Sequence, residues 1–183
     1  MTASNVSASA AAGFLGALIS DAPSPELADT ARDFGWLIGG WTAEVLDIDG
    51  DGRVRRGEGE WWFAWVLEGR AIQDVWISPP RGKRGGISDP AAADNRYGTT
   101  VRWLDRREGV WRVVWVNPGT GVMSVLAGRR EGDRIVLVGE DPEGAFRWSF
   151  NDIRPDSFVW RGETRNTHGE WRLGAEFRLK RLA

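Results

Sequence analysis

From Trp41 to the C-terminus, apolar and charged residues alternate with a period of two, and this pattern constrains the fold more than any other feature. Ala175, Phe177 and Leu179, for example, are separated by Glu176 and Arg178. Because successive side chains of a strand point to opposite faces, such alternation predicts strands with one buried side. We expect strands at 41–48, 54–67, 71–78, 97–105, 110–116, 122–130, 134–140, 145–152, 157–165 and 170–181.

The connections between these segments are mostly short and contain Gly, Pro, Asn and Asp, as in the DGDG run at 49–52. Short turns between consecutive strands are typical of an antiparallel meander. No long helix separates the strands, which excludes βαβ units. A long meander removes its exposed edges by closing on itself, so we expect a closed antiparallel up-and-down barrel of about ten strands. A β-sandwich is the alternative fold. The longest connection, 79–95, is rich in Gly and Pro and is expected to be a mobile loop over the barrel mouth.

Aromatic residues recur on one side of the expected strands. The chain has 12 tryptophans, seven phenylalanines and one tyrosine. We expect the following residues inside the barrel: Tyr97, Thr99, Val101, Trp103, Trp111, Val113, Trp115, Asn117, Phe146, Trp148, Phe150, Phe158, Trp160, Trp171, Leu173, Ala175, Phe177 and Leu179. A register shift of one residue would reverse any of these orientations. Rings in this number either fill a barrel or line a cavity, and the sequence leaves both open.

One helix is expected ahead of the strands, over residues 24–34. Ser24 is a good N-cap, Pro25 suits the first helical position, and Leu27 and Phe34 fall on one face. We expect residues 1–9 to be disordered and residues 10–20 to form a short apolar helix that docks on the domain. The domain organisation is therefore a disordered or loosely docked segment, 1–23, followed by one barrel domain, 24–183.

Charge and cysteine content exclude several classes of function. The formal net charge is -2, which lacks the basic footprint needed for nucleic acid or for an anionic membrane surface. The sequence contains no cysteine, which excludes disulfides, thiolate nucleophiles and cysteine-bound metal. No Lys or Arg precedes the apolar stretch at 10–19, so it lacks the features of a signal peptide. A cytoplasmic location fits these features.

Gly39 and Trp41, between the expected helix and the first strand, form a Gly-x-Trp motif that resembles the signature of lipocalins and the wider calycin superfamily. The resemblance implies that Trp41 closes one barrel end beneath a basic residue of the last strand, either Arg178 or Arg181. The segments RWSFNDIRPDSFVWRGETR and HGEWRLGAEFRLKR resemble an uncharacterised bacterial family of lipocalin-like domains, from about Phe34 to the C-terminus.

The chain also has a distant similarity to nitrobindins, barrels that bind haem iron through a histidine on a strand. The sole histidine here, His168, falls in the turn at 166–169, from which it does not easily reach a barrel interior. We therefore expect no haem, and a solvated turn histidine instead.

A second metal motif lies in the first hairpin. Asp47, Asp49, Asp51 and Glu58 match the spacing of a calcium-binding loop. The exiting helix of such a loop is missing, and three arginines crowd the site, so an Asp-Gly hairpin turn is the preferred interpretation. Arg81 and the glycines after it lack the setting of a phosphate-binding loop. We expect no cofactor.

The expected function is binding of a small hydrophobic, planar ligand inside the barrel. The candidate ligand-binding residues are Trp65, Tyr97, Thr99, Trp103, Trp115, Asn117, Trp148 and Trp160. No Ser-His-Asp triad is supported, and no catalytic residue is assigned. Two alternatives stay open: an isomerase or cyclase acting on an apolar substrate, and a packed barrel that serves only self-association. Asp74, Asp152 and Glu60, and with them Gln73, face inward or outward depending on register.

Adjacent tryptophans suggest a partner surface. Trp61 and Trp62 must point to opposite faces of a regular strand, and Trp76 raises the same question. A tryptophan outside the barrel is covered either by the N-terminal segment or by a second subunit, so a homodimer is expected.

Overall fold

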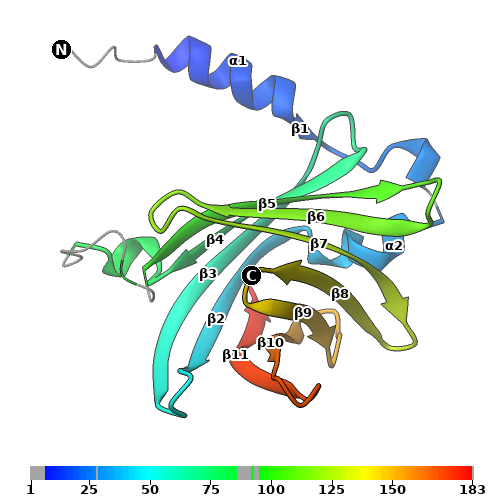
Figure 1. Ribbon diagram of the computed structural model, residues 1–183. Helices are drawn as coiled ribbons and strands as arrows, with labels where there is room; N and C mark the ends of the chain where they lie inside the picture. The colour runs from blue at the N-terminus through cyan, green and yellow to red at the C-terminus, as the bar shows by residue number, and fades with distance from the viewer. Residues whose placement is uncertain (1–6, 28, 86–91, 93–94, 183) are drawn as a thin grey trace.

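Ten long strands, β2 to β11, dominate the computed structural model, which describes residues 7–27, 29–85, 92 and 95–182 (Figure 1). Their bounds are β2 Gly39–Ile48, β3 Val54–Val66, β4 Ala71–Ser78, β5 Arg96–Asp105, β6 Val110–Asn117, β7 Val122–Glu131, β8 Arg134–Asp141, β9 Gly144–Asn151, β10 Ser157–Arg165 and β11 Trp171–Arg181. The expected strands are confirmed to within one or two residues at each end.

All of these strands belong to one antiparallel sheet. Each pairs with its neighbours in the chain, β11 pairs with β2, and the barrel therefore has no free edge among β2 to β11. The closed up-and-down barrel is confirmed and is calycin-like, and the sandwich is excluded. Because strands alternate in direction, the turns after β2, β4, β6, β8 and β10 all lie at one end, which we call the mouth. The opposite end is the closed end.

A chain of short helical turns covers the closed end: η1 Pro25–Leu27, α2 Ala31–Phe34 and η2 Gly35–Leu37 (Figure 1). The expected continuous helix over 24–34 is wrong, although its apolar face is right, since Leu27 and Phe34 are buried. The Thr30 hydroxyl donates to the Leu27 carbonyl oxygen at 3.3 Å, a local bond that favours a turn over a helix. Residue 28 lies outside the described residues.

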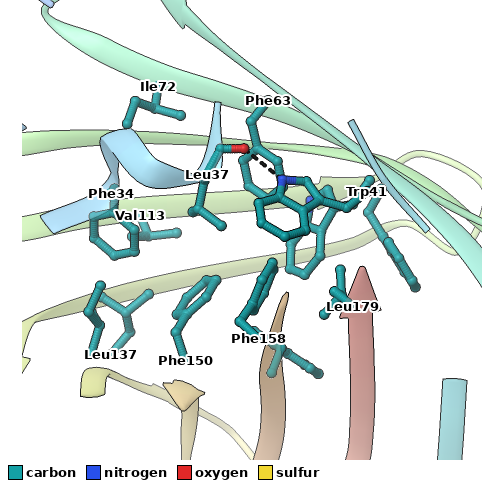
Figure 2. Close-up of a cluster of buried hydrophobic side chains, with 14 of the residues drawn as sticks. Phe34, Leu37, Trp41, Phe63, Ile72, Val113, Leu137, Phe150, Phe158 and Leu179 are labelled. Atoms are coloured by element: carbon teal, nitrogen blue, oxygen red, sulfur yellow. Dashed lines mark hydrogen bonds between the residues drawn. The ribbon is translucent and has the colours of Figure 1, made fainter. Parts of the chain in front are cut away.

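Trp41 lies at the centre of this closed end and is fully buried, as the resemblance implied (Figure 2). Its indole nitrogen donates to the Leu37 carbonyl oxygen at 2.7 Å. The guanidinium of Arg181 lies 4.1 Å from the centre of the Trp41 ring, and its Nη1 donates to the Ile38 carbonyl oxygen at 2.8 Å. Of the two candidate basic residues, Arg181 is the one that covers Trp41. Arg178 is exposed and pairs with Glu176.

Aromatic rings fill the space between Trp41 and the barrel wall (Figure 2). Phe158 meets Trp41 edge to face at 4.8 Å between centroids, and Phe34 meets Phe150 in the same manner at 5.5 Å. Edge-to-face pairs stabilise aromatic clusters beyond the area that they bury. The closed end of the barrel is therefore packed solid.

The N-terminal helix, α1 (Ala8–Leu18), projects away from the barrel (Figure 1). None of its residues is buried. The two-residue strand β1 (Ile19–Ser20) follows it and pairs with β3. Residues 1–6, on which part of the expected disorder falls, lie outside the described residues. Within the described part of the chain, no helix has the length and apolar character needed to cross a membrane.

Candidate functional site

A cavity of about 440 Å³ opens inside the barrel between the packed closed end and the mouth. Its wall comes from nine of the barrel strands and from the turn after β6. The lining residues are Trp61, Trp76, Arg96, Thr100, Arg102, Val113, Trp115, Asn117, Thr120, Val122, Leu137, Trp148, Phe150, Trp160, Ala175 and Phe177. The barrel is therefore packed at one end and hollow at the other.

Three stacked rings form one side of the cavity. Phe177 lies between Trp76 and Trp160, with centroid distances of 4.7 and 4.5 Å and interplanar angles of 16° and 19°. The strands β4, β10 and β11 each supply one ring. The two tryptophans cover both faces of Phe177, so the three rings form one tightly stacked apolar unit.

Glycines let the large rings lie close to the sheet. A Cβ on Gly59 would lie 2.3 Å from the Trp76 ring, and a Cβ on Gly162 would lie 2.7 Å from the Trp160 ring. Real Cβ atoms do not approach rings this closely, so both glycines are required by the position of their tryptophan. The space that these glycines leave is taken by the outer edge of each six-membered ring.

A buried ion pair closes the inner end of the cavity. Arg102 of β5 donates to Asp74 of β4, and both side chains are excluded from water. The guanidinium lies 5.2 Å from the ring centres of both Phe34 and Phe63. Burial raises the pKa of Asp74, although the positive charge of Arg102 opposes that change. Removing either partner would leave an unpaired charge in the core.

A second ion pair crosses the mouth. Both terminal nitrogens of Arg96 on β5 donate to the Asp47 carboxylate on β2, at 3.1 and 2.7 Å. The Arg96 guanidinium lies 5.8 Å from the centre of the Phe177 ring. Because β2 and β5 are not adjacent, this pair spans part of the opening. Asn117, on the same rim, accepts a hydrogen bond from the Gly119 backbone N–H and so supports the turn after β6.

Of the eight candidate ligand-binding residues, four lie in the cavity wall: Trp115, Asn117, Trp148 and Trp160. Trp65 is buried at the closed end, where its ring packs against Gly35. It lies outside the cavity lining.

The interior orientation expected for Tyr97, Thr99 and Trp103 is wrong, and so is that of Val101. Tyr97 and Trp103 are 50% and 39% exposed on the outer face, whereas Thr100 and Arg102 point inward. The register of β5 is displaced by one residue from the expected one, because Arg102 reaches Asp74 only from the interior. Gly98 also faces inward, where a Cβ would collide with the Trp115 ring at 2.5 Å.

Sequence reasoning missed the residues that carry the cavity's charge, and it missed one ring of the stack, Trp76. The expected orientation of β5 placed Arg96, Thr100 and Arg102 outside the barrel, whereas all three line the cavity. This inward orientation of β5 could have been inferred from Asp74, since a carboxylate on the inner face of an apolar strand requires a buried partner. Trp61 and Trp76 both turn out to face inward, and Trp62 lies outside beneath Arg81.

The other acidic residues of interest lie apart from the cavity. Glu60 faces outward and is held by Arg81, at 2.9 Å from its Nε. Gln73 faces outward and donates to Thr99 at 2.9 Å. Asp152 is exposed in the turn after β9. Glu60 borders a charged groove of about 860 Å³ on the outer surface, whose position outside the barrel separates it from the aromatic wall.

The four acidic residues of the calcium motif are engaged in separate contacts. Asp47 pairs with Arg96, Asp49 with Arg55 at 3.0 Å, and Glu58 with Lys83 at 2.6 Å. The Asp51 carboxylate accepts the backbone N–H of Arg53 at 3.1 Å. No three acidic or histidine side chains gather in the described residues to hold a metal ion. His168 is exposed in the turn between β10 and β11.

Loop 79–95 is described only in part. The one-turn helix η3, Arg81–Lys83, lies at its start. Arg84 lies 5.1 Å from the centre of the Tyr97 ring and donates to the Pro79 carbonyl oxygen. Residues 86–91, 93 and 94 lie outside the described residues. The prediction that this loop lies over the mouth falls mostly on those residues.

Comparison with solved structures supports the fold. Rv2717c from M. tuberculosis is similar over 88% of this chain and 99% of its own, with a TM-score of 0.57 and 16% identity. The S-type phycobiliprotein lyase CPES from Guillardia theta is similar over 82% and 90%, with a TM-score of 0.56 and 15% identity. No known family profile and no curated protein matches the chain, so its resemblance to an uncharacterised lipocalin-like family stays a prediction. At these identities, the comparisons establish that the chain has the barrel fold of these proteins.

Proposed function

We propose that this protein binds a small hydrophobic, planar ligand in the cavity of its barrel. The observation that carries the proposal is the cavity of about 440 Å³, with a wall dominated by aromatic and aliphatic side chains. Ligand sites in proteins are typically clefts of roughly 300–1,000 Å³ with apolar walls and few polar groups. This volume suits a molecule of two or three fused rings.

The aromatic side chains of the lining favour a ligand with a planar ring system. The stack of Trp76, Phe177 and Trp160 lies on one side, and Trp115 and Trp148 line the same cavity. Planar molecules gain contact area and offset stacking against such rings. An empty apolar cavity leaves its wall atoms without dispersion partners, so filling it is favourable.

The isomerase or cyclase alternative receives less support. Arg96 and Arg102 are the ionisable residues among the described lining, and each is engaged by an aspartate. An acid or base that acts on a substrate needs a free group within hydrogen-bond reach. The wall is therefore better suited to binding than to proton transfer.

Titration of the intrinsic tryptophan fluorescence with a neutral planar probe, 2-acetylnaphthalene, tests the proposal. We expect saturable quenching with one site per chain. Trp115→Ala should weaken binding by ~1–3 kcal/mol, the scale of a lost contact with a buried aromatic ring.

Trp62→Ala is the matched control, because Trp62 lies outside the barrel. This variant should leave the affinity unchanged. An absence of saturable binding, or equal losses in the two variants, would show that the probe does not occupy the cavity and would contradict the proposal.

A further inference from the structure

Helix α1 has no surface to pack against in its own chain. Its 11 residues include no charged side chain, and none of them is buried. Phe14 and Leu15 are 66% and 51% exposed. A helix that is apolar on nearly all sides is normally covered, and a helix of this length is barely stable in water on its own. The exposed surface of α1 therefore calls for a partner.

The base of α1 is fixed to the barrel. Strand β1 pairs with the end of β3, with Ile19 opposite Val66, and the Leu67 backbone N–H donates to the Leu18 carbonyl oxygen at 2.9 Å. From this point the helix projects away from the barrel (Figure 1). The helix is therefore held at one end and uncovered along its length.

A groove of about 620 Å³ lies beside the base of α1, on the outer surface near the closed end of the barrel. Its apolar lining includes Leu67, Val101, Trp103 and Leu104, and α1 contributes Ala17. One chain therefore carries both an uncovered apolar helix and an open groove with apolar walls.

The charged residues around this groove satisfy one another. Arg70 pairs with both Glu26 and Glu68, and Arg106 pairs with Glu26 at 3.3 Å. These four are the charged residues of the described lining. The groove therefore offers apolar contacts to an uncharged segment such as α1, and it offers no free counter-charge to a charged one.

We propose that a second copy of this chain covers α1, with the helix of each copy lying in the groove of the other. An 11-residue helix is about 16 Å long and about 10 Å across. Covering half of it against a matching groove, twice by two-fold symmetry, removes on the order of 1,000 Å² from water. Stable interfaces bury about 1,200–2,000 Å², so the two helices supply most of what a dimer needs.

The remaining area is available next to the groove. Val101 lines the groove and lies opposite Val114 of β6, which in turn lies opposite Val125 of β7. These outward valines continue the apolar surface from the groove across the neighbouring strands. One continuous surface of the barrel can therefore receive both the helix and the barrel of the second copy.

A lipid bilayer is less suited to cover α1. The length of about 16 Å is roughly half of the hydrocarbon core of a bilayer. Helices that lie in the membrane interface carry Lys or Arg on a polar face and often Trp or Tyr, and α1 contains none of these residues.

Cross-linking tests the contact directly, because the sequence contains no cysteine and every thiol is an introduced one. Affinity-tagged Ala11→Cys is equilibrated at micromolar concentration with untagged Arg106→Cys and treated with a short bismaleimide. We expect a heterodimer in which residue 11 of one chain is joined to residue 106 of the other. Arg172→Cys, on the exposed face of β11, is the matched control for Arg106→Cys and should give no such product.

A chain with both Ala11→Cys and Arg106→Cys distinguishes contact between copies from contact within one chain. We expect the cross-link to join two chains and its yield to fall on dilution. A cross-link within single chains whose yield is unchanged by dilution would mean that α1 folds onto its own barrel, and it would overturn the proposal.

A charge on α1 tests the energetic role of the helix. Leu15→Glu should raise the dissociation constant of the dimer about tenfold or more, because a carboxylate buried in the groove would lack a partner. Sedimentation velocity over a range of concentrations measures the change. Val54→Glu is the matched control, since Val54 is equally exposed at the mouth end of β3 and should leave the dissociation constant unchanged.

Two further results would overturn the proposal. One is an equal dissociation constant for Leu15→Glu and Val54→Glu. The other is flotation of the unsubstituted protein with phosphatidylcholine vesicles that Leu15→Glu abolishes, which would make a lipid surface the partner of α1. None of these measurements involves the cavity, so they stand or fall separately from the proposed ligand binding.

Discussion

At the scale of single residues, the closed end of the barrel depends on the contact between Trp41 and Arg181. Trp41 is fully buried among rings and uses its one N–H on Leu37. Arg181 covers the ring and also donates to the Ile38 carbonyl oxygen, so it joins the last strand to the turn before the first long strand. The two residues therefore hold the first long strand, β2, and the last strand, β11, together at the closed end of the barrel.

Trp41→Ala should destabilise the protein by about 3–5 kcal/mol, the usual cost of deleting a large aromatic side chain from a packed core. Urea denaturation followed by circular dichroism measures the change. Trp62→Ala serves as the comparison, because Trp62 is 40% exposed. A loss for Trp41→Ala under about 1 kcal/mol would mean that Trp41 is peripheral.

At the scale of elements, η3 is attached to strand β3 through Glu60. The Glu60 carboxylate accepts the Arg81 backbone N–H at 2.7 Å and the Trp62 indole N–H at 2.8 Å, in addition to the Arg81 guanidinium. Hydrogen bonding from the Arg81 side chain is the main cause that lowers the pKa of Glu60 from 4.5 to about 2. The start of the long loop beside the mouth is thereby fixed to the barrel wall.

This contact predicts a defined pH dependence. Above pH 4.5 the carboxylate is ionised in both the folded and the unfolded chain, and the contact stabilises fully. Between pH 4.5 and 2 the Glu60 carboxyl is protonated in the unfolded chain and still ionised in the folded chain. The stabilisation from this contact is therefore lost as the pH falls through this range. Glu60→Gln should therefore destabilise the protein at pH 6 and lose most of that effect near pH 2.5, as measured by denaturant unfolding at both pH values. An effect of the variant that is independent of pH would contradict the prediction.

The strands could be predicted from the sequence almost residue by residue, because alternation and turn residues act locally. The orientation of β5 could not. Its apolar residues, Val101 and Trp103, face outward, and the inner face carries Arg102, whose partner Asp74 lies on another strand. The alternation pattern reflects only the hydrophobicity of the side chains. In β5 the buried ion pair between Arg102 and Asp74 decides which face points inward, against that pattern. Half of the candidate site residues therefore lie in the cavity wall, and those of β5 do not.

The short helices show the same limit. The burial of Leu27 and Phe34 could be predicted from the sequence, because burial follows the spacing of apolar residues. The break between η1 and α2 was not, since Thr30 and its bond to Leu27 compete with the helix only weakly in isolation. Contacts with the barrel decide such cases.

At the scale of the whole molecule, the outer face of β4 to β7 has a patch without charged side chains. Two rows cross these four strands, Val75–Thr99–Val116–Met123 and Gln73–Val101–Val114–Val125, and neither row contains a charge. Met123 and Val125 are 68% and 54% exposed. A continuous exposed apolar face on a folded domain often marks an interface.

The expected homodimer is therefore best placed at this face, with a second copy of the same chain as its occupant. A two-fold arrangement would set the uncharged rows of one barrel against those of the other. Sedimentation velocity at micromolar concentration should show a dimer, and Val125→Lys should shift it to monomer because a buried charge would lack a partner. Arg172→Lys, on the exposed face of β11, is the control. A monomer in the unsubstituted protein would contradict this assignment.

The glycines beside the cavity tryptophans link the positions of these rings to the volume of the chamber. Gly162→Ala would place a methyl group 2.7 Å from the Trp160 ring, and Gly59→Ala would place one 2.3 Å from the Trp76 ring, so in either variant the ring would have to move. Neither variant changes a hydrogen-bonding group, so each would alter the room left for a bound molecule and leave the polarity of the wall unchanged.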